Sequence, residues 1–208
     1  MPTAPRLSKQ ARYARRKADS EAEVGRLPPV RNPRSRSHAR VDPLFFGMHY
    51  FPDGIGQASL SVDHALMIDT MEMCFSRGGQ YAQAIFRGFI KTTSAEMMTL
   101  WAMLHGHRFF FFFLGSEDEV AAESIDNIRR ELEENDRLLD AYPETGYPTR
   151  ALDGKHQRCE SQTFRGRKTH SKIVTGKLIL PTIRLDQAEA AKLGIPVDDR
   201  GFTLGGGA

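Results

Sequence analysis

The segment 81–93 constrains the fold most, because its residue order is that of a phosphate-binding loop between a strand and a helix. An apolar run at 82–86 precedes Arg87-Gly88, and Lys91-Thr92-Thr93 follow two residues later. A helix-compatible apolar segment then extends from Ser94 to Leu104. In such a loop, backbone N–H groups and the helix N-terminus surround the anion, the Lys binds phosphates and the hydroxyl binds Mg²⁺. The pattern therefore predicts a strand, a tight loop and a helix.

Two residues depart from this pattern. Ile90 stands directly before Lys91, where glycine is expected, and Phe89 takes the place of a small residue. Glycine serves there because the backbone turns tightly and approaches the phosphate closely. We therefore expect no more than weak binding of ATP and Mg²⁺. An ordinary strand-to-helix turn with a solvated Lys and Thr remains the alternative.

The residues after the loop extend the pattern to β-α-β. Gly106 is suited to ending the helix, and the basic residues around it lie at the negative end of the helix dipole. The run Phe109–Leu114 is apolar and of strand length, as in a strand buried on both faces. We therefore predict an α/β fold in which 81–86 and 109–114 are parallel strands of one sheet, joined by a right-handed crossover helix at 92–104.

Apolar spacing and capping residues predict three more helices, at 61–77, 116–139 and 187–193. Ser116 and Glu119 have the spacing of a capping box at the start of the second. Asp186 and Gly194 bound the third as its N-cap and its C-terminal glycine.

Positive charge is concentrated at the N-terminus, where residues 1–42 hold eleven Lys/Arg against four Asp/Glu. Because this segment has few large apolar residues, we predict a disordered basic arm at 1–42 and a folded domain at 43–208. Such an arm binds nucleic-acid phosphates without reading sequence, although a solvated leader with no partner is the alternative.

A second basic stretch lies within 145–184 and predicts either a phosphate-tracking surface or a solvated hairpin. Its basic residues are Arg150, Lys155, Arg158, Arg165, Arg167, Lys168 and Lys172.

The sequence gives little support for a metal site, a disulfide framework or a membrane span. Cys74 and Cys159 have neither metal-ligand nor disulfide-framework spacing, and the longest apolar run, of six residues, is too short to cross a membrane.

Together these motifs resemble the ATPase domain of the large terminase subunits of tailed phages. The resemblance covers roughly 44–181 and is strongest over 78–134. Besides the loop, it is carried by Leu100–Arg108, Asp126–Glu133 and Leu180-Pro181-Thr182. It implies a P-loop NTPase-like, three-layer αβα domain with a mainly parallel sheet. In that family, ATP hydrolysis drives double-stranded DNA into a capsid.

The resemblance also implies roles for individual residues and partners. The implied ATP-binding residues are Gly88, Lys91, Thr92 and Thr93. Thr92 would also hold Mg²⁺, and Arg87 would act in catalysis or sensing. Asp63-His64 lies in the region from which the family takes adenine contacts. The implied partners are double-stranded DNA, the portal and the small terminase subunit, in the cytoplasm of a bacterial host carrying the phage or prophage.

An ATPase of this class also needs a second apolar strand that ends in acidic residues, which hold Mg²⁺ and orient the attacking water. The best later run, 177–186, is interrupted by Pro181, which a central strand tolerates badly. We therefore expect an incomplete sheet and little or no ATPase activity from this chain alone. Three functions stay open: an impaired packaging ATPase, a non-enzymatic basic nucleic-acid-binding protein, and a non-functional fragment.

Overall fold

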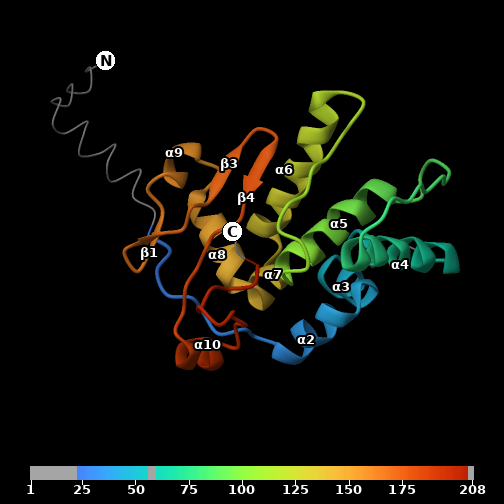
Figure 1. The fold of residues 1–208 in the computed structure, drawn as a ribbon. Helices are drawn as coiled ribbons and strands as arrows, with labels where there is room; N and C mark the ends of the chain where they lie inside the picture. Colours follow the sequence, from blue (N-terminus) through green and yellow to red (C-terminus); the bar gives the residue numbers. More distant parts are fainter. Residues whose placement is uncertain (1–22, 56–59, 206–208) are drawn as a thin grey trace, which may run out of the picture.

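The computed structural model describes residues 23–55 and 60–205, and these residues fold mostly into helices (Figure 1). The helices are α2 (Pro33–Val41), α3 (Pro43–Tyr50), α4 (Val62–Arg77), α5 (Lys91–Leu104), α6 (Asp118–Glu134), α7 (Asp136–Ala141), α8 (Pro143–Leu152), α9 (His156–Cys159) and α10 (Gln187–Leu193). The strands are β1 (Thr163–Phe164), β2 (Arg167–Lys168), β3 (Lys172–Val174) and β4 (Lys177–Ile179). Within the described residues, β1 pairs with β2 and β3 with β4, both antiparallel.

The predicted α/β fold is wrong. Neither 81–86 nor 109–114 forms a strand, so the described residues contain no parallel sheet and no three-layer αβα domain. The expected crossover helix does form, as α5, but no paired strand stands on either side of it. An apolar run indicates a tendency to burial, whereas a strand also requires a neighbouring strand to share its hydrogen bonds. In the described part of the chain these two runs have no such neighbour.

Short polar caps explain where the first helices begin. Asn32 accepts a hydrogen bond from the backbone N–H of Ser35 at 3.1 Å and starts α2. Asp42 accepts one from the N–H of Phe45 at 2.8 Å and starts α3. A proline follows each cap at the first helical position, where its missing N–H costs nothing. The two helices therefore follow each other with a bend at Asp42.

The main core lies where α3, α5, α6 and α7 meet. Trp101 on α5 is buried, and its indole N–H donates to the Ala39 carbonyl at 2.8 Å. Tyr50 and Tyr142 lie edge to face, with ring centroids 5.6 Å apart. Phe46 contacts both tyrosine rings, at 5.2 and 6.3 Å between centroids. Because each aromatic ring removes a large apolar area from water, these residues contribute strongly to the stability of the core.

A second core joins the N-terminal segment to the C-terminal part of the chain, which lie side by side in Figure 1. Its buried residues are Val24, Leu27, Val30, Phe164, Ile183, Leu185, Ala190 and Ile195. The Val30 N–H donates to the Leu193 carbonyl at 2.8 Å, and the Val24 N–H to the Thr163 carbonyl at 2.9 Å. The expectation of disorder is therefore wrong for residues 23–42, while residues 1–22 lie outside the described residues.

Of the three helices predicted from spacing and caps, two are confirmed over their whole length. α4 matches the expected 61–77 and ends before Gly78, whose φ is 78°. α10 matches 187–193, and Asp186 caps it by accepting from the Glu189 N–H at 2.8 Å. The third, α6, forms only over Asp118–Glu134 and has no side-chain cap, so the capping box expected from Ser116 is wrong. The expected continuation to 139 is also wrong, because Asn135 ends α6 and caps the separate helix α7. Among the described helices, none combines the length and apolar character that a membrane span requires.

Candidate functional site

The loop residues singled out in the sequence gather at the N-terminus of α5. Lys91 is the first residue of the helix, and Thr92 and Thr93 follow in its first turn with exposed side chains. Gly88, just before them, has a φ of 91° that favours glycine. Arg87 is exposed beside it. The structure therefore places these five residues on one short loop and helix start, although no strand leads into it.

Lys91 closes this loop with its own side chain. Its Nζ donates to the carbonyl oxygens of Ile85 and Phe86, at 2.8 and 2.7 Å. α5 has no side-chain cap, so the first N–H groups of the helix have no hydrogen-bonding side chain there. An anion at this place would meet an ammonium group and a helix N-terminus.

The two residues that depart from the phosphate-loop pattern have structural roles of their own. Phe89 is buried, and its ring stacks on that of His64 with centroids 3.7 Å apart. Ile90 adopts the left-handed region at φ 45°, which is a strained conformation for a β-branched residue. His64 on α4 therefore contacts the loop through the Phe89 ring, and the adenine contacts implied for the region of Asp63-His64 stay a prediction. The ring that stacks on His64 is that of Phe89, which stands where the phosphate-loop pattern has a small residue.

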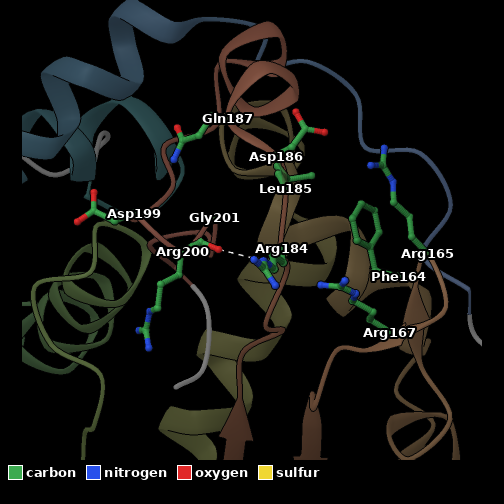
Figure 2. A pocket seen from close by; sticks show the side chains of 10 residues that line it. All are labelled: Phe164, Arg165, Arg167, Arg184, Leu185, Asp186, Gln187, Asp199, Arg200 and Gly201. Carbon is green, nitrogen blue, oxygen red and sulfur yellow. Dashed lines mark hydrogen bonds between the residues drawn. The ribbon is translucent and has the colours of Figure 1, made fainter.

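A second candidate site is a pocket of about 570 Å³ formed by the β1–β2 hairpin and the C-terminal segment (Figure 2). The hairpin turn is tight, with Arg165 at φ 53° and Gly166 at φ 72°, and β2 follows it directly. Leu185 N–H donates to the Gly201 carbonyl at 2.9 Å, so the chain end folds back against 184–185. The residues that line the pocket are Phe164, Arg165, Arg167, Arg184, Leu185, Asp186, Gln187, Asp199, Arg200 and Gly201.

The four arginines of this pocket differ in how far their charge is neutralised. Arg165 forms a two-pronged ion pair with Glu189, and this hydrogen bonding raises the pKa of Arg165 above its ordinary value. Arg200 approaches Asp198 at 3.4 Å, with most of its side chain exposed. Arg184 donates its Nε to the Arg200 carbonyl at 2.9 Å. The Arg167 side chain has no hydrogen-bond or ion-pair partner within 23–55 and 60–205.

An aromatic ring organises the guanidinium groups. The Phe202 ring has the guanidinium carbons of Arg184 and Arg200 within 5.7 and 5.6 Å of its centroid. Such cation–π contacts hold an arginine by its flat face and leave its N–H edge free to bind. In Figure 2, Arg167 points across the pocket toward Arg184, whereas Arg165 points away from it. Arg167 and Arg184 are therefore the donors most available to an anion in this pocket.

Two acidic residues, Asp186 and Asp199, line the pocket beside the four arginines, and Asp198 lies next to it. Asp186 is engaged as the N-cap of α10. Asp198 accepts the N–H groups of Phe202 and Arg200, at 2.8 and 2.9 Å, and these hydrogen bonds lower the pKa of its carboxyl. It remains ionised at neutral pH and anchors the turn that carries Arg200. The arrangement can bind a phosphate through paired guanidinium groups.

In the basic stretch at 145–184, some residues form ion pairs with a carboxylate and others do not. Arg150 pairs with Asp136 at 3.0 Å, and Lys155 and Arg158 pair with Asp153 at 2.8 and 3.7 Å. The exposed residues without a carboxylate partner among the described residues are Arg167, Lys168 and Lys172. The predicted phosphate-binding surface thus reduces to the hairpin around β2 and its neighbours.

Sequence reasoning missed Arg184 and Arg200. In the sequence each lies close to an aspartate, so neither stands out as part of a basic patch. Only the fold-back of the chain end, with a bridge between Arg184 and Phe202, brings them beside Arg167. The spacing Arg184-x-Asp186 and Asp198-x-Arg200 carries no signal that could have indicated this.

The fit of ATP and Mg²⁺ to the α5 loop is partial. Lys91 and the exposed Thr92 hydroxyl could contact a phosphate group and a cation. However, the described residues contain no cluster of three or more His, Cys, Asp or Glu that could hold a metal ion. The geometry therefore offers an ammonium group and a helix start that a phosphate could contact, while hydrolysis would also require an acidic residue that holds Mg²⁺.

Comparisons with protein-family models, with curated proteins and with solved structures found no match to this chain. The terminase resemblance therefore remains a prediction. What the fold and the site define directly is a mostly helical protein with an arginine-lined pocket.

Proposed function

We propose that this chain binds the phosphate backbone of double-stranded DNA, with the arginine pocket as its folded contact surface. The observation that carries this proposal is the pairing of Arg167 and Arg184 in one pocket. Their guanidinium edges face a common space and lack carboxylate partners among the described residues. Guanidinium groups bind phosphate oxygens in pairs of parallel hydrogen bonds, so two of them suit a phosphodiester backbone.

The charge of the whole chain supports the same partner. Its formal net charge is +3 and its sequence pI is about 8.9. Of these charges, residues 1–22, outside the described part, hold six Lys/Arg against two Asp/Glu. A positive field of this kind attracts DNA and accelerates encounter, while the pocket supplies fixed contacts. Binding of this type does not read base sequence.

A second candidate function is weak nucleotide binding by the α5 loop, as part of a DNA-packaging ATPase. The specific observation in its favour is the gathering of Gly88, Lys91, Thr92 and Thr93 at one helix start. Arg87 would then act on the γ-phosphate, and ATP with Mg²⁺ would be the ligand. The portal and the small terminase subunit would be its partners, and the cytoplasm of a bacterial host its compartment. Both candidates share double-stranded DNA as partner.

The first proposal is tested by the salt dependence of DNA binding. Fluorescence anisotropy with a labelled duplex of random sequence, over a series of salt concentrations, gives the slope of log K against log salt. In Arg167→Gln/Arg184→Gln, affinity should fall at every salt concentration. The slope should flatten by about 0.9 for each DNA phosphate that the variant no longer neutralises.

The matched control is Arg77→Gln/Arg130→Gln, which removes two positive charges from exposed sites on α4 and α6. It should change the slope much less than Arg167→Gln/Arg184→Gln does. The proposal fails if Arg167→Gln/Arg184→Gln and the control give the same slope as the unmodified chain. An ATP-dependent thermal shift that Lys91→Ala abolishes would support the second candidate instead.

A further inference from the structure

Arg165 occupies a backbone position that does not favour arginine. It is the first of the two residues in the turn between β1 and β2, with a φ of 53°, and Gly166 follows at 72°. Turns with a positive φ at both central positions favour Asn or Asp before Gly, because other side chains crowd the backbone there. An unfavourable conformation at an exposed turn points to a role for the side chain rather than for the backbone.

Two glutamates bind the hairpin, and they bind different parts of it. One carboxylate oxygen of Glu23 accepts the Arg165 N–H at 2.9 Å, and the other accepts the Thr163 hydroxyl. Glu189 on α10 instead binds the Arg165 guanidinium, through one hydrogen bond to each carboxylate oxygen. The turn therefore keeps its anchor at Glu23 when the guanidinium leaves Glu189.

Of the two partners in this ion pair, Glu189 is the more firmly held. Its N–H donates to the Asp186 carboxylate at 2.8 Å, and the next residue, Ala190, is buried in the second core. The Arg165 side chain is 54% exposed, and its guanidinium carbon lies 5.2 Å from the Phe164 ring centroid. A pair with this much exposure adds little to stability, because water solvates both charges when they separate. Arg165 is therefore the partner that can move.

The ion pair lies at the edge of the arginine pocket. Arg165 lines this pocket together with Arg167 and Arg184, yet its side chain points away from it in Figure 2. A carboxylate and a phosphate both offer a guanidinium two adjacent oxygen acceptors. Glu189 thus satisfies the Arg165 guanidinium in the way that a phosphate would.

We propose that Arg165 is a third phosphate-binding residue of the arginine pocket, and that Glu189 holds it aside until a DNA phosphate replaces the carboxylate. This role rests on the proposed function, because the pocket and its phosphodiester ligand are the same. In the free protein, Arg165 is paired with Glu189. In the complex, its flexible side chain turns to join Arg167 and Arg184 at the DNA backbone. Glu189 thereby lowers the affinity for DNA, since its pair with Arg165 has to be broken.

Anisotropy with a labelled random duplex over a salt series tests both partners. Arg165→Gln should weaken binding and flatten the slope of log K against log salt by about 0.9, since one phosphate contact is lost. Glutamine is as disfavoured as arginine at a positive φ, so the turn is equally strained in this variant. Glu189→Gln should instead tighten binding by up to about fivefold, because an exposed pair is removed that DNA otherwise breaks. Its slope should equal that of the unmodified chain.

The matched control is Asp199→Asn, because removing any carboxylate near DNA strengthens binding. Asp199 is exposed and lines the same pocket. The gain in affinity from Asp199→Asn should be the same in the unmodified chain and in Arg165→Gln. The gain from Glu189→Gln should be larger in the unmodified chain and should fall to that of the control in Arg165→Gln, where no pair is left to break. An equal gain from Glu189→Gln in both backgrounds would refute the proposal.

Two further results separate a failure of this role from a failure of the proposed function. If Arg167→Gln/Arg184→Gln leaves DNA binding unchanged, the proposed function fails and the role of Arg165 fails with it. If that variant weakens binding while Arg165→Gln does not, the pocket binds DNA without Arg165. A pair that only holds the hairpin to α10 would also overturn the proposal, because Glu189→Gln would then be less stable in urea and would bind DNA with unchanged affinity.

Discussion

Arg36 on α2 and Glu144 on α8 form a buried ion pair between residues 108 positions apart in the sequence. The guanidinium and carboxylate meet through two hydrogen bonds, of 2.5 and 3.2 Å, and the side chains are 6% and 0% exposed. Arg36 also donates to the Ala141 carbonyl at 2.9 Å and lies 4.7 Å from the Tyr142 ring centroid. Residues assigned by composition to a basic arm therefore contribute a charge to the interior.

Breaking this pair should strongly destabilise the fold. Glu144→Gln leaves the Arg36 charge buried without its counter-charge, so the free energy of unfolding should fall by about 3 kcal/mol. The double variant Arg36→Met/Glu144→Leu removes both charges and should recover most of that decrease. Urea denaturation measures each value. If Glu144→Gln were as stable as the unmodified chain, the pair would not be holding α2 to α8.

Deleting residues 1–22 should leave the fold intact but weaken DNA binding. The deletion removes six Lys/Arg from the chain and should flatten the slope of log K against log salt. Deleting 1–42 should instead unfold the protein, because it also removes Val24, Leu27 and Val30 from the second core, and Arg36. Circular dichroism and anisotropy separate the two effects. An unchanged slope after the shorter deletion would show that residues 1–22 do not bind DNA.

His105 should make stability depend on pH. Its Nδ1–H donates to the Trp101 carbonyl, and its Nε2 accepts the Tyr142 hydroxyl, both at 2.9 Å. Burial lowers the pKa of this histidine from 6.5 to about 3, with Arg36 adding to the effect against the hydrogen bond to Trp101. Between these values the unfolded chain binds the proton and the folded chain does not. Stability is therefore present above pH 6.5 and is lost progressively as the pH falls toward 3.

The size of this decrease is about 1.4 kcal/mol for each pH unit within that window. Unfolding by urea at several pH values should show it. His105→Gln is less stable at neutral pH, because it alters a packed hydrogen-bonded site, but its difference from the unmodified chain should shrink as the pH falls. The same substitution at exposed His38 controls for the change of residue type. A constant difference for His105→Gln across the range would contradict a neutral buried imidazole.

Replacing Ile90 and replacing Phe89, in the loop before α5, should change the free energy of unfolding in opposite directions. Ile90→Gly relieves the left-handed conformation at φ 45° and should raise the free energy of unfolding by up to about 1 kcal/mol. Phe89→Ser removes a buried ring that stacks on His64 and should lower it by about 3 kcal/mol. Thermal unfolding of each variant measures these two changes in stability.

The same variants test the phosphate-binding role of the loop. Ile90→Gly should also tighten ATP binding measured by calorimetry, because it frees the backbone before Lys91 to approach a phosphate. Lys91→Ala should abolish that binding. Equal heats of binding for Ile90→Gly and Lys91→Ala would show that the loop does not bind nucleotide.

Local signals in the sequence were sufficient for α4, α5 and α10. Asp186 and Gly194 bound α10 at the positions expected from an N-cap and a C-terminal glycine. Gly78 ends α4 for the same reason, because these signals act within one helical turn and need no distant partner. The loop residues Gly88, Lys91 and Thr92 came together because they are neighbours in the chain.

Pairing and burial between distant residues were decided only by the tertiary structure. The runs 81–86 and 109–114 have strand composition, yet no strand lies beside either among the described residues, so neither becomes one. Arg36 is buried because the fold brings Glu144 to it across 108 residues. Arg184 reaches the arginine pocket because the chain end folds back against it. Each depends on which surfaces meet, and composition carries no information about that.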